Sequence, residues 1–213
     1  MAFDVKYFVP LSAMANSNVP RYFLYKDDTD SLATIATANY FLSAHMHLQA
    51  GDIIRVFPAA GVNPIDLVVL TATSTSVTVG VGAGGTADLT ATNTLVAGQS
   101  GGTFFLNSAT EFVTTLPAPA PGLKFKFICK AAPASASYTI VTASSANIIV
   151  GQFASSADAG GSMDSEASGG DTITFVDGQA VKGDWVEVIS DGTNWYATGM
   201  SADEDALTIT TAS

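Results

Sequence analysis

The stretch Leu123-Lys124-Phe125-Lys126-Phe127-Ile128-Cys129-Lys130 decides the fold class of this chain. Successive side chains of a β-strand point to opposite faces, so alternating apolar and charged residues indicate a strand with one buried face. One face receives Leu123, Phe125, Phe127 and Cys129, and the other receives Lys124, Lys126 and Lys130. The stretch therefore predicts a long strand that covers a hydrophobic core.

Short apolar runs separated by Gly, Asp-Gly and Ser/Thr turns lie on both sides of this stretch. Such spacing is typical of an all-β sandwich or barrel. The runs predict strands at Arg21–Tyr25, Gly51–Phe57, Ile65–Thr71, Ser76–Val79, Thr103–Leu106, Leu123–Ala131, Tyr138–Thr142, Asn147–Val150, Thr172–Val176, Trp185–Ile189, Asn194–Thr198 and Ala206–Thr210. Only Asn39–His47 is predicted to form a helix, a short one. We expect an all-β fold with two small antiparallel β-sandwich or barrel domains.

The predicted domains are an extended N-terminal arm of residues 1–20, a β-domain of residues 21–98 and a second β-domain of residues 99–213. The boundary near Gly98 rests on Val79–Gly102, which is rich in Gly, Ala and Thr and is typical of a mobile joint. A second linker, Leu116–Gly122, contains spaced prolines and is expected to be extended.

Turn chemistry is explicit at four places in the sequence. Asp177-Gly178 and Asp191-Gly192 each follow a predicted strand and favour hairpin turns, because glycine adopts the positive φ that such turns need. Gly51–Val56 and Gly183–Val188 both begin with Gly-Asp and continue into a strand. We interpret this pair as two β-domains that use the same turn.

Composition excludes several classes of protein. Hydrophobic residues make up 47% of the chain and charged residues 13%, which predicts a folded chain. A net charge of −11 repels phosphate backbones, so we expect no nucleic-acid partner. No run reaches the roughly 18 apolar residues of a membrane helix. Asp4 interrupts the place of a secretory signal, and one cysteine, Cys129, suits a core position in a protein assembled in the cytoplasm.

Two glycine-rich motifs raise the question of enzymatic activity. Gly80–Gly85 fits a dinucleotide-binding pattern, but β-type sequence follows it where a helix is required. Gly98–Gly102 fits G-x-S-x-G, and Ser100 with the upstream His45 makes a serine hydrolase a remote alternative. Both histidines precede Ser100, whereas a hydrolase elbow needs a later one. We therefore predict no catalytic residue and no cofactor.

Metal binding is also not predicted. His45 and His47 have no cysteine nearby to complete a zinc site. Asp27, Asp28 and Asp30 resemble the start of a calcium loop but lack its later glycine and glutamate, which favours a solvated turn.

The candidate interaction residues fall into three groups. Lys124, Lys126 and Lys130 form a stripe that could hold an acidic segment such as Asp164–Asp171, from the same or a neighbouring subunit, or could be an ordinary solvated face. Trp185 and Trp195 could stack on a sugar or pack in a core or interface. The third group is Phe3, Tyr7, Phe8 and Val9, which are too apolar for a free tail and are predicted either to cover their own domain or to lie on a neighbouring subunit.

The sequence resembles the small β-rich structural proteins of tailed-phage virions. The resemblance is carried by Leu106–Phe112, Leu116–Pro119, Ala131–Pro133, Ser137–Thr142, Ala146–Ile149, Gly169–Asp177 and Asp191–Trp195, and more weakly by Tyr40-Phe41 and Leu48–Ile54. It implies a non-enzymatic virion protein. The expected function is head decoration: a cement protein, as a homotrimer, bound to the major capsid protein at the capsid surface after assembly in the host cytoplasm. The alternative is a tail-fibre or receptor-binding module for host glycan.

Overall fold

The computed structural model describes residues 3–11, 19–59, 64–82, 84–108, 110–156 and 163–211, with backbone alone for 163–167. It is an all-β protein with two compact units, Met1–Gly85 and Thr86–Ser213. The division lies between Gly85 and Thr86 and not near Gly98. Residues 86–98 belong to the second unit because Thr86–Leu89 pairs with Thr103–Leu106 in one sheet.

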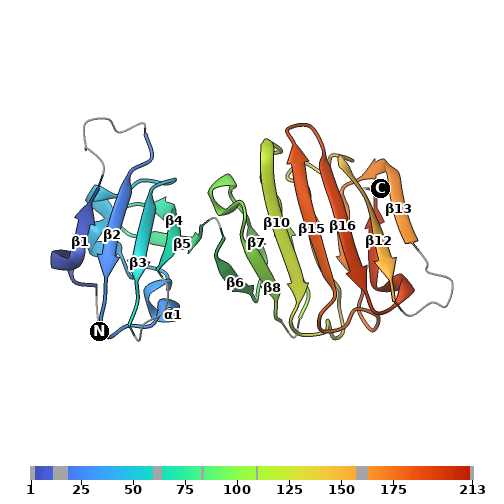
Figure 1. Cartoon of the computed structure of the whole chain (residues 1–213), viewed down its shortest axis with the longest axis horizontal. Coiled ribbons are helices and arrows are strands. Elements are labelled where there is room, and N and C mark those ends of the chain that lie inside the picture. Colours follow the sequence, from blue (N-terminus) through green and yellow to red (C-terminus); the bar gives the residue numbers. More distant parts are fainter. Residues whose placement is uncertain are drawn as a thin grey trace. The chain divides into compact units, whose positions relative to one another are not determined.

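Unit 1 contains one five-stranded sheet in the order β1-β2-β3-β4-β5 (Figure 1). Its elements are η1 (Val5–Tyr7), β1 (Phe8–Pro10), β2 (Tyr22–Lys26), α1 (Leu32–Ile35), η2 (Leu42–His47), β3 (Ile53–Phe57), β4 (Ile65–Ala72) and β5 (Val77–Val81). β2 and β3 run parallel, and the other neighbours run antiparallel. The core lies on the side of the sheet that α1 and η2 cover, because Ile35 and Ala44 are buried there with the strand residues.

The first residues of the chain are part of unit 1. β1 pairs antiparallel with β2, and Phe8 stacks on Phe23 with ring centroids 4.7 Å apart. Phe3 contacts the rings of Tyr25 and Phe41 at 5.2 and 5.4 Å. The expected extended arm is therefore wrong for residues 3–11, because their inward aromatic side chains complete the core of their own unit. Residues 12–18 lie outside the described ranges.

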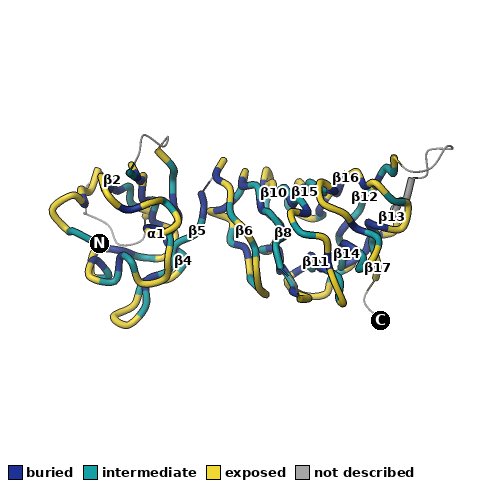
Figure 2. Tube along the Cα trace, turned by 90° about the horizontal axis from the view of Figure 1, so that it is seen from below, coloured by how far each residue is buried: buried dark blue, intermediate teal, exposed yellow. Residues whose placement is uncertain are grey.

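Unit 2 is a sandwich of two sheets (Figure 2). Its elements are β6 (Thr86–Leu89), β7 (Asn93–Thr94), η3 (Ala97–Gln99), β8 (Thr103–Leu106), β9 (Phe112–Thr115), β10 (Pro121–Cys129), β11 (Tyr138–Val141), β12 (Ile149–Ser155), β13 (Met163–Gly170), β14 (Thr172–Phe175), β15 (Trp185–Asp191), β16 (Trp195–Ser201), η4 (Glu204–Ala206) and β17 (Leu207–Thr210). One sheet has the order β13-β12-β16-β15-β10-β8-β6, and the other has the order β17-β14-β11-β9-β7.

From β6 to β11 the chain alternates between the two sheets. β6, β8 and β10 are parallel neighbours in the seven-stranded sheet, and β7, β9 and β11 are parallel neighbours in the other. Each strand of one sheet thus serves as the crossover that parallel strands of the other require. All three sheets are mixed, so the expected antiparallel pairing is wrong while the all-β class is confirmed.

The predicted strand at Leu123–Ala131 is confirmed as β10. Its inward residues Phe125, Phe127 and Cys129 have no exposed surface, and Leu123 is 8% exposed. Burial and the neighbouring Asp184 carboxylate together raise the pKa of the Cys129 thiol to about 11.

Every other predicted strand overlaps an observed one, but β1, β6, β7, β9, β13 and the short helix α1 were not predicted.

The glycine-rich segment Val79–Gly102 is not a joint without structure. Outside the single undescribed position 83, it holds the end of β5 and all of β6, β7 and η3. Gly82 packs so closely that a Cβ atom there would lie 2.8 Å from the carbonyl oxygen of Asp66. Glycine therefore permits close packing at this position, and the boundary between the two units lies inside the glycine-rich segment, between Gly85 and Thr86.

The two predicted Asp-Gly hairpins differ. Asp191-Gly192 joins β15 to its antiparallel neighbour β16, with Gly192 at φ 101°. Gly178 also has a positive φ, but β14 and β15 on either side of its turn belong to different sheets. The Asp177-Gly178 turn is therefore a crossing between sheets and not a hairpin.

The repeated Gly-Asp pattern has the same local structure in both units. The N–H of Gln49 donates to Asp52 Oδ2 and that of Val181 to Asp184 Oδ2, each at 2.8 Å. In turn, the N–H of Asp52 donates to the Gln49 carbonyl at 3.1 Å, and that of Asp184 donates to the Val181 carbonyl at 3.2 Å. The preceding glycines have φ of 92° and 106°. Both aspartates are buried at the entrance to a strand, as the shared turn predicts.

Candidate interaction surfaces

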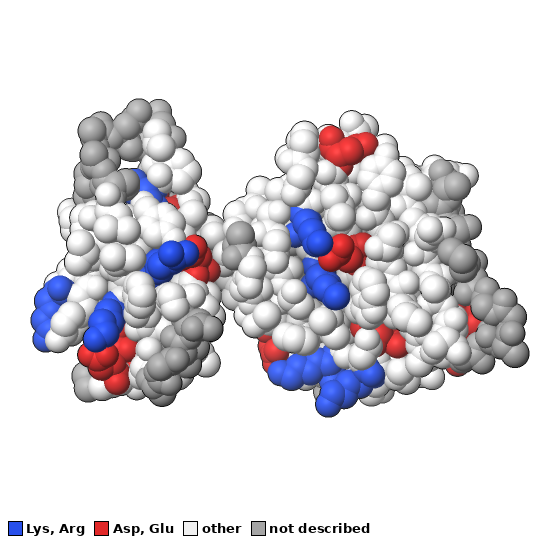
Figure 3. All heavy atoms as spheres, in the orientation of Figure 1, with Lys and Arg blue, Asp and Glu red and all other residues white. Residues whose placement is uncertain are grey.

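The outer face of the seven-stranded sheet carries the predicted lysine stripe. We call it the lysine face and define it by the outward residues of its central strands and by the lysine that follows β10. These are Thr103, Phe105, Lys124, Lys126, Ile128, Lys130, Trp185, Glu187, Ile189, Tyr196, Thr198 and Met200. It faces the viewer in Figure 3, where uncharged atoms dominate and a few charges lie over β10 and β15.

Strand register arranges these side chains in rows across the strands. One row is apolar, because Ile128 lies opposite Phe105 on one side and Trp185 on the other, and Trp185 lies opposite Met200. A polar row follows, with Glu187 between Lys126 and Thr198. The next row is formed by Lys124, Ile189 and Tyr196. Opposite residues in a sheet are near neighbours, so each row is a continuous strip of surface.

Each lysine of the stripe contacts a side chain of the same unit. Lys124 Nζ lies 3.0 Å from Glu187 Oε2. Lys130 pairs with the Asp88 carboxylate of β6, which lowers the pKa of Asp88 through the hydrogen bond from that lysine. Lys126 Nζ lies over the Trp185 ring, 4.5 Å from its centroid. The stripe is therefore a patterned surface of ion pairs and a cation–π contact.

The acidic segment Asp164–Asp171 is not the partner of the stripe within its own unit. Most of it forms β13, at one edge of the sheet, and β12, β16 and β15 separate it from β10. Asp171 is buried and accepts a hydrogen bond from the Thr172 hydroxyl at 2.9 Å. The carboxylates that pair with the stripe are Asp88 of β6 and Glu187 of β15. This pairing depends on how the strands are arranged in the tertiary structure.

The two tryptophans play different roles. Trp195 has no exposed surface, and its ring centroid lies 5.8 Å from that of Phe125 in the core. Trp195 is therefore not an interaction residue, because strand alternation turns it inward with Ala197. The same alternation turns Tyr196 and Met200 outward, at 47% and 46% exposure. This signal was present in the sequence, and it could have identified the two residues as part of the surface.

The N-terminal candidates also separate into two pairs. Phe3 and Phe8 point into the core of unit 1, whereas Tyr7 and Val9 are 49% and 48% exposed. The exposed pair lines an open groove of about 360 Å³ on the outer side of the unit 1 sheet. The groove is completed by Lys6, Leu24, Lys26 and Phe57. Only Tyr7 and Val9 of the four remain candidates for contact with another molecule.

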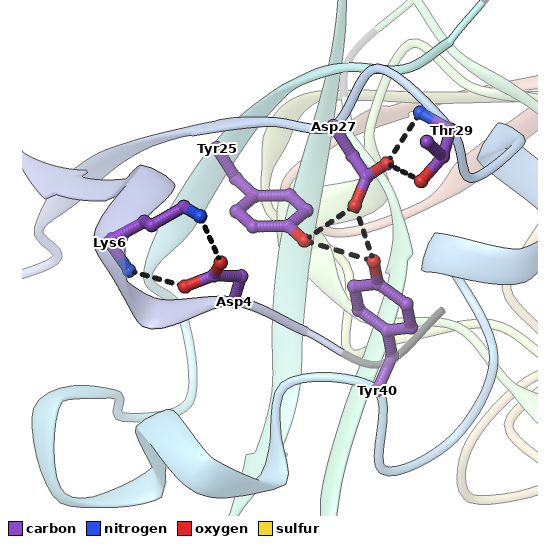
Figure 4. A network of polar contacts seen from close by, with 6 residues as sticks. All are labelled: Asp4, Lys6, Tyr25, Asp27, Thr29 and Tyr40. Carbon is purple, nitrogen blue, oxygen red and sulfur yellow. Dashed lines mark hydrogen bonds and ion pairs between the residues drawn. The ribbon is translucent and has the colours of Figure 1, made fainter.

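A buried polar network in unit 1 involves two of the three aspartates that resemble a calcium loop. Asp27 Oδ1 accepts from the N–H groups of Thr29 and Asp30 and from the Thr29 hydroxyl, each at 2.7 Å. Asp27 Oδ2 lies 3.0 Å from the Tyr25 hydroxyl and 3.2 Å from that of Tyr40 (Figure 4). Tyr40 also donates to Asp30 Oδ2 at 2.9 Å. The expected solvated turn is wrong for Asp27 and Asp30, which are 8% and 7% exposed.

This network determines the electrostatics of the turn. Burial by itself would raise the pKa of Asp27, but the hydrogen bonds from Asp30 and Thr29 outweigh burial and lower that pKa well below its ordinary value. Burial and the nearby oxygens raise the pKa of the Tyr40 hydroxyl. Asp27 therefore acts as a charged acceptor that holds the turn after β2 against the Tyr40 segment.

The motif residues of the hydrolase hypothesis have structural partners. Ser100 Oγ accepts from the N–H of Lys124 at 3.0 Å, which joins the η3 turn to β10. His45 Nδ1 lies 3.0 Å from the carbonyl oxygen of Leu42. Ser100 belongs to unit 2 and both histidines to unit 1. Gly80–Gly85 leads into strand β6, where a dinucleotide site would need a helix.

Two features were sought among the residues that the structure describes, a cluster of metal-ligating side chains and a membrane-spanning helix. No three His, Cys, Asp or Glu side chains among them come together as a metal-binding group. In the same part of the chain, no helix combines the length and hydropathy of a bilayer span.

Comparisons with protein-family models, curated proteins and solved structures found no match to this chain.

Proposed function

We propose that this protein is a non-enzymatic head-decoration protein of a tailed phage, which binds the major capsid protein as a homotrimer and cements the shell. The observation that carries the proposal is the lysine face, a broad sheet surface that exposes Ile189, Tyr196 and Met200 between paired charges. Exposed apolar surface of this kind is typical of protein–protein contact sites.

The residues that resemble phage virion proteins support the same proposal, because most of them lie in unit 2. A cement protein needs surface for subunits and shell, and several modest contacts then add through avidity. Synthesis in the host cytoplasm agrees with the reduced, buried Cys129.

The glycan-binding alternative is weaker in this structure. An aromatic platform for a sugar needs an accessible ring face. Trp195 is buried, Lys126 covers one face of Trp185, and the Tyr196 hydroxyl is bound to Asp191 Oδ2 at 3.1 Å. What remains near Trp185 is a shallow hollow of about 250 Å³.

The deciding experiment is a copy count in purified virions of the phage that encodes the chain. Quantitative mass spectrometry would compare this protein with the major capsid protein. The proposal expects hundreds of copies per particle, since decoration proteins repeat over the shell. A handful of copies would assign the chain to a tail appendage and reject the proposal.

A further inference from the structure

Residues 3–11, which we call the N-terminal segment, are attached to unit 1 along one side. Among the described strands, β1 pairs with β2 alone. The N–H of Leu11 extends this pairing and donates to the Tyr22 carbonyl at 2.8 Å. Phe3 and Phe8 add the aromatic contacts in the core. The segment is therefore held by one short strand pairing and two rings.

The site that receives the N-terminal segment is built from other parts of unit 1. Phe3 and Phe8 contact aromatic side chains of β2 and of the residues just before η2, namely Phe23, Tyr25, Tyr40 and Phe41. None of these four belongs to the segment itself, so the site fits residues 3–11 of another copy equally well. Exchange of an identical element between copies keeps its contacts and therefore costs little free energy.

The connection from β1 to β2 is long enough to reach another copy. Residues 12–20 separate Leu11 from Arg21. Such a length spans up to about 30 Å when extended, whereas antiparallel neighbours can be joined by a two-residue turn. Pro10 and Pro20 stand at the two ends, and a proline favours extended backbone in the residue before it. The sequence at both ends therefore favours an extended chain over a tight return.

Exposed apolar side chains are concentrated on and beside the N-terminal segment. Of the eleven large hydrophobic side chains that are exposed among the described residues, five lie there, with exposures from 48% to 60%. They are Val5, Tyr7, Val9, Leu11 and Val19. Exchange would bring a second chain against the segment and its connection, and it would cover these side chains where the two copies cross.

We propose that the N-terminal segment of each copy completes unit 1 of the next copy, so that exchanged strands hold the homotrimer together. The inference rests on the proposed function and names the segment that joins its subunits. Phe3 and Phe8 remain core residues in this arrangement, and only the copy that supplies them changes. The partner is a second copy of this chain, because the site already fits its residues 3–11.

The test places one cysteine on each side of the β1–β2 pairing, in different chains. Val9 and Leu24 are register partners on the outer face of the sheet. The Cα atoms of such partners lie about 4.5–5.5 Å apart, within the range for a disulfide. Full-length Val9→Cys and Leu24→Cys chains with different tags are produced in the same cells, purified and oxidised. The natural Cys129 is buried and does not compete.

The expected result is a disulfide that joins one chain of each kind, seen as a product of twice the chain mass that carries both tags. If every segment stays in its own copy, the two cysteines never meet and this product is absent. Its absence would overturn the proposal. Far-UV circular dichroism checks that each variant keeps the β-spectrum of the unchanged protein, which we expect because both side chains point outward.

Thr71 and Thr78 provide the matched control. They are register partners on β4 and β5, with hydroxyl oxygens 2.8 Å apart. The turn between these strands is closed by the N–H of Thr73, which donates to the Ser76 carbonyl at 2.8 Å, so both strands belong to one copy. Thr71→Cys and Thr78→Cys in different chains should give no joined product. A joined product here as well would show that bonds between chains form without exchange, and it would remove the support.

A chain that carries both Val9→Cys and Leu24→Cys gives the number of copies. Disulfides that link three chains support the exchange together with the proposed homotrimer. Disulfides that link only two chains support the exchange and reject the trimer. Chains bonded only internally reject the exchange, and the decoration function then still depends on the copy count in virions alone.

Discussion

Asp27 is a single residue that joins three parts of unit 1. Its carboxylate accepts from the turn that follows it and from the hydroxyl of Tyr25 on β2, and it lies 3.2 Å from the hydroxyl of Tyr40 near η2. When a buried carboxylate loses its charge, the groups that donate hydrogen bonds to it lose a strong acceptor. The loss lowers folding stability by about 1–3 kcal/mol. The fold of unit 1 therefore depends on one carboxylate within an otherwise ordinary Asp-rich turn.

We expect Asp27→Asn to lower the free energy of unfolding of unit 1 by about 1–3 kcal/mol, because the amide accepts more weakly than the carboxylate. Far-UV circular dichroism in urea measures the change. Asp28→Asn is the control, since the Asp28 side chain is 78% exposed, and we expect a change within about 0.5 kcal/mol. Equal effects of the two substitutions would contradict a special role for Asp27.

The same residue makes stability depend on pH. Because the folded pKa of Asp27 is lowered from 3.8, the unfolded chain binds its proton more readily than the folded chain. The contribution of Asp27 to stability is therefore complete above about pH 5, and it is lost as the pH falls below 3.8 towards the folded pKa. Asp27→Asn should weaken this acid dependence, which urea titrations at several pH values would show.

At the scale of elements, β1 shows how strand alternation assigns roles. Phe8 faces the core and is 8% exposed, whereas its neighbour Val9 faces outward and is 48% exposed. β1 is also an edge strand whose outer side is protected, since the N–H of Phe8 donates to Val5 and Pro10 has none. The N-terminal segment is thus a structural strand with an exposed outer side.

We expect Phe8→Ala to destabilise unit 1 by about 3–5 kcal/mol, because it removes a ring stacked in the core. Val9→Ala is the control and should cost less than about 1 kcal/mol. Both tryptophans of the chain lie in unit 2, so tryptophan fluorescence follows the unfolding of unit 2. Phe8→Ala should leave that transition unchanged, while circular dichroism follows the unfolding of unit 1. A Phe8→Ala protein as stable as Val9→Ala would show that β1 is dispensable.

At the scale of the whole molecule, the chain consists of two units with separate cores. The hydrophobic core of unit 1 contains residues from Phe8 to Val77, and the sandwich of unit 2 buries its own aromatic residues between its sheets. Separate cores predict separate folding, because each unit buries its apolar surface internally.

We expect residues 86–213, expressed alone, to fold into the sandwich. The fragment should show the blue-shifted emission of a buried Trp195 and a cooperative urea transition at the midpoint of the full chain. Residues 99–213, cut at the boundary expected from the sequence, serve as the comparison. They lack β6 and β7, so their transition should come at lower urea. A fragment 86–213 that stays unfolded would contradict the independence of unit 2.

The sequence by itself determined the all-β class, most strand positions, the inward face of β10 and the shared turn at Asp52 and Asp184. These features depend on local physics, namely strand alternation and the positive φ of glycine. Tertiary structure alone decided which strands became neighbours, including the alternation between sheets from β6 to β11. It also decided that Glu187 and Asp88 pair with the lysines and that Asp27 is buried, because such contacts join residues far apart in the chain and no local pattern encodes them.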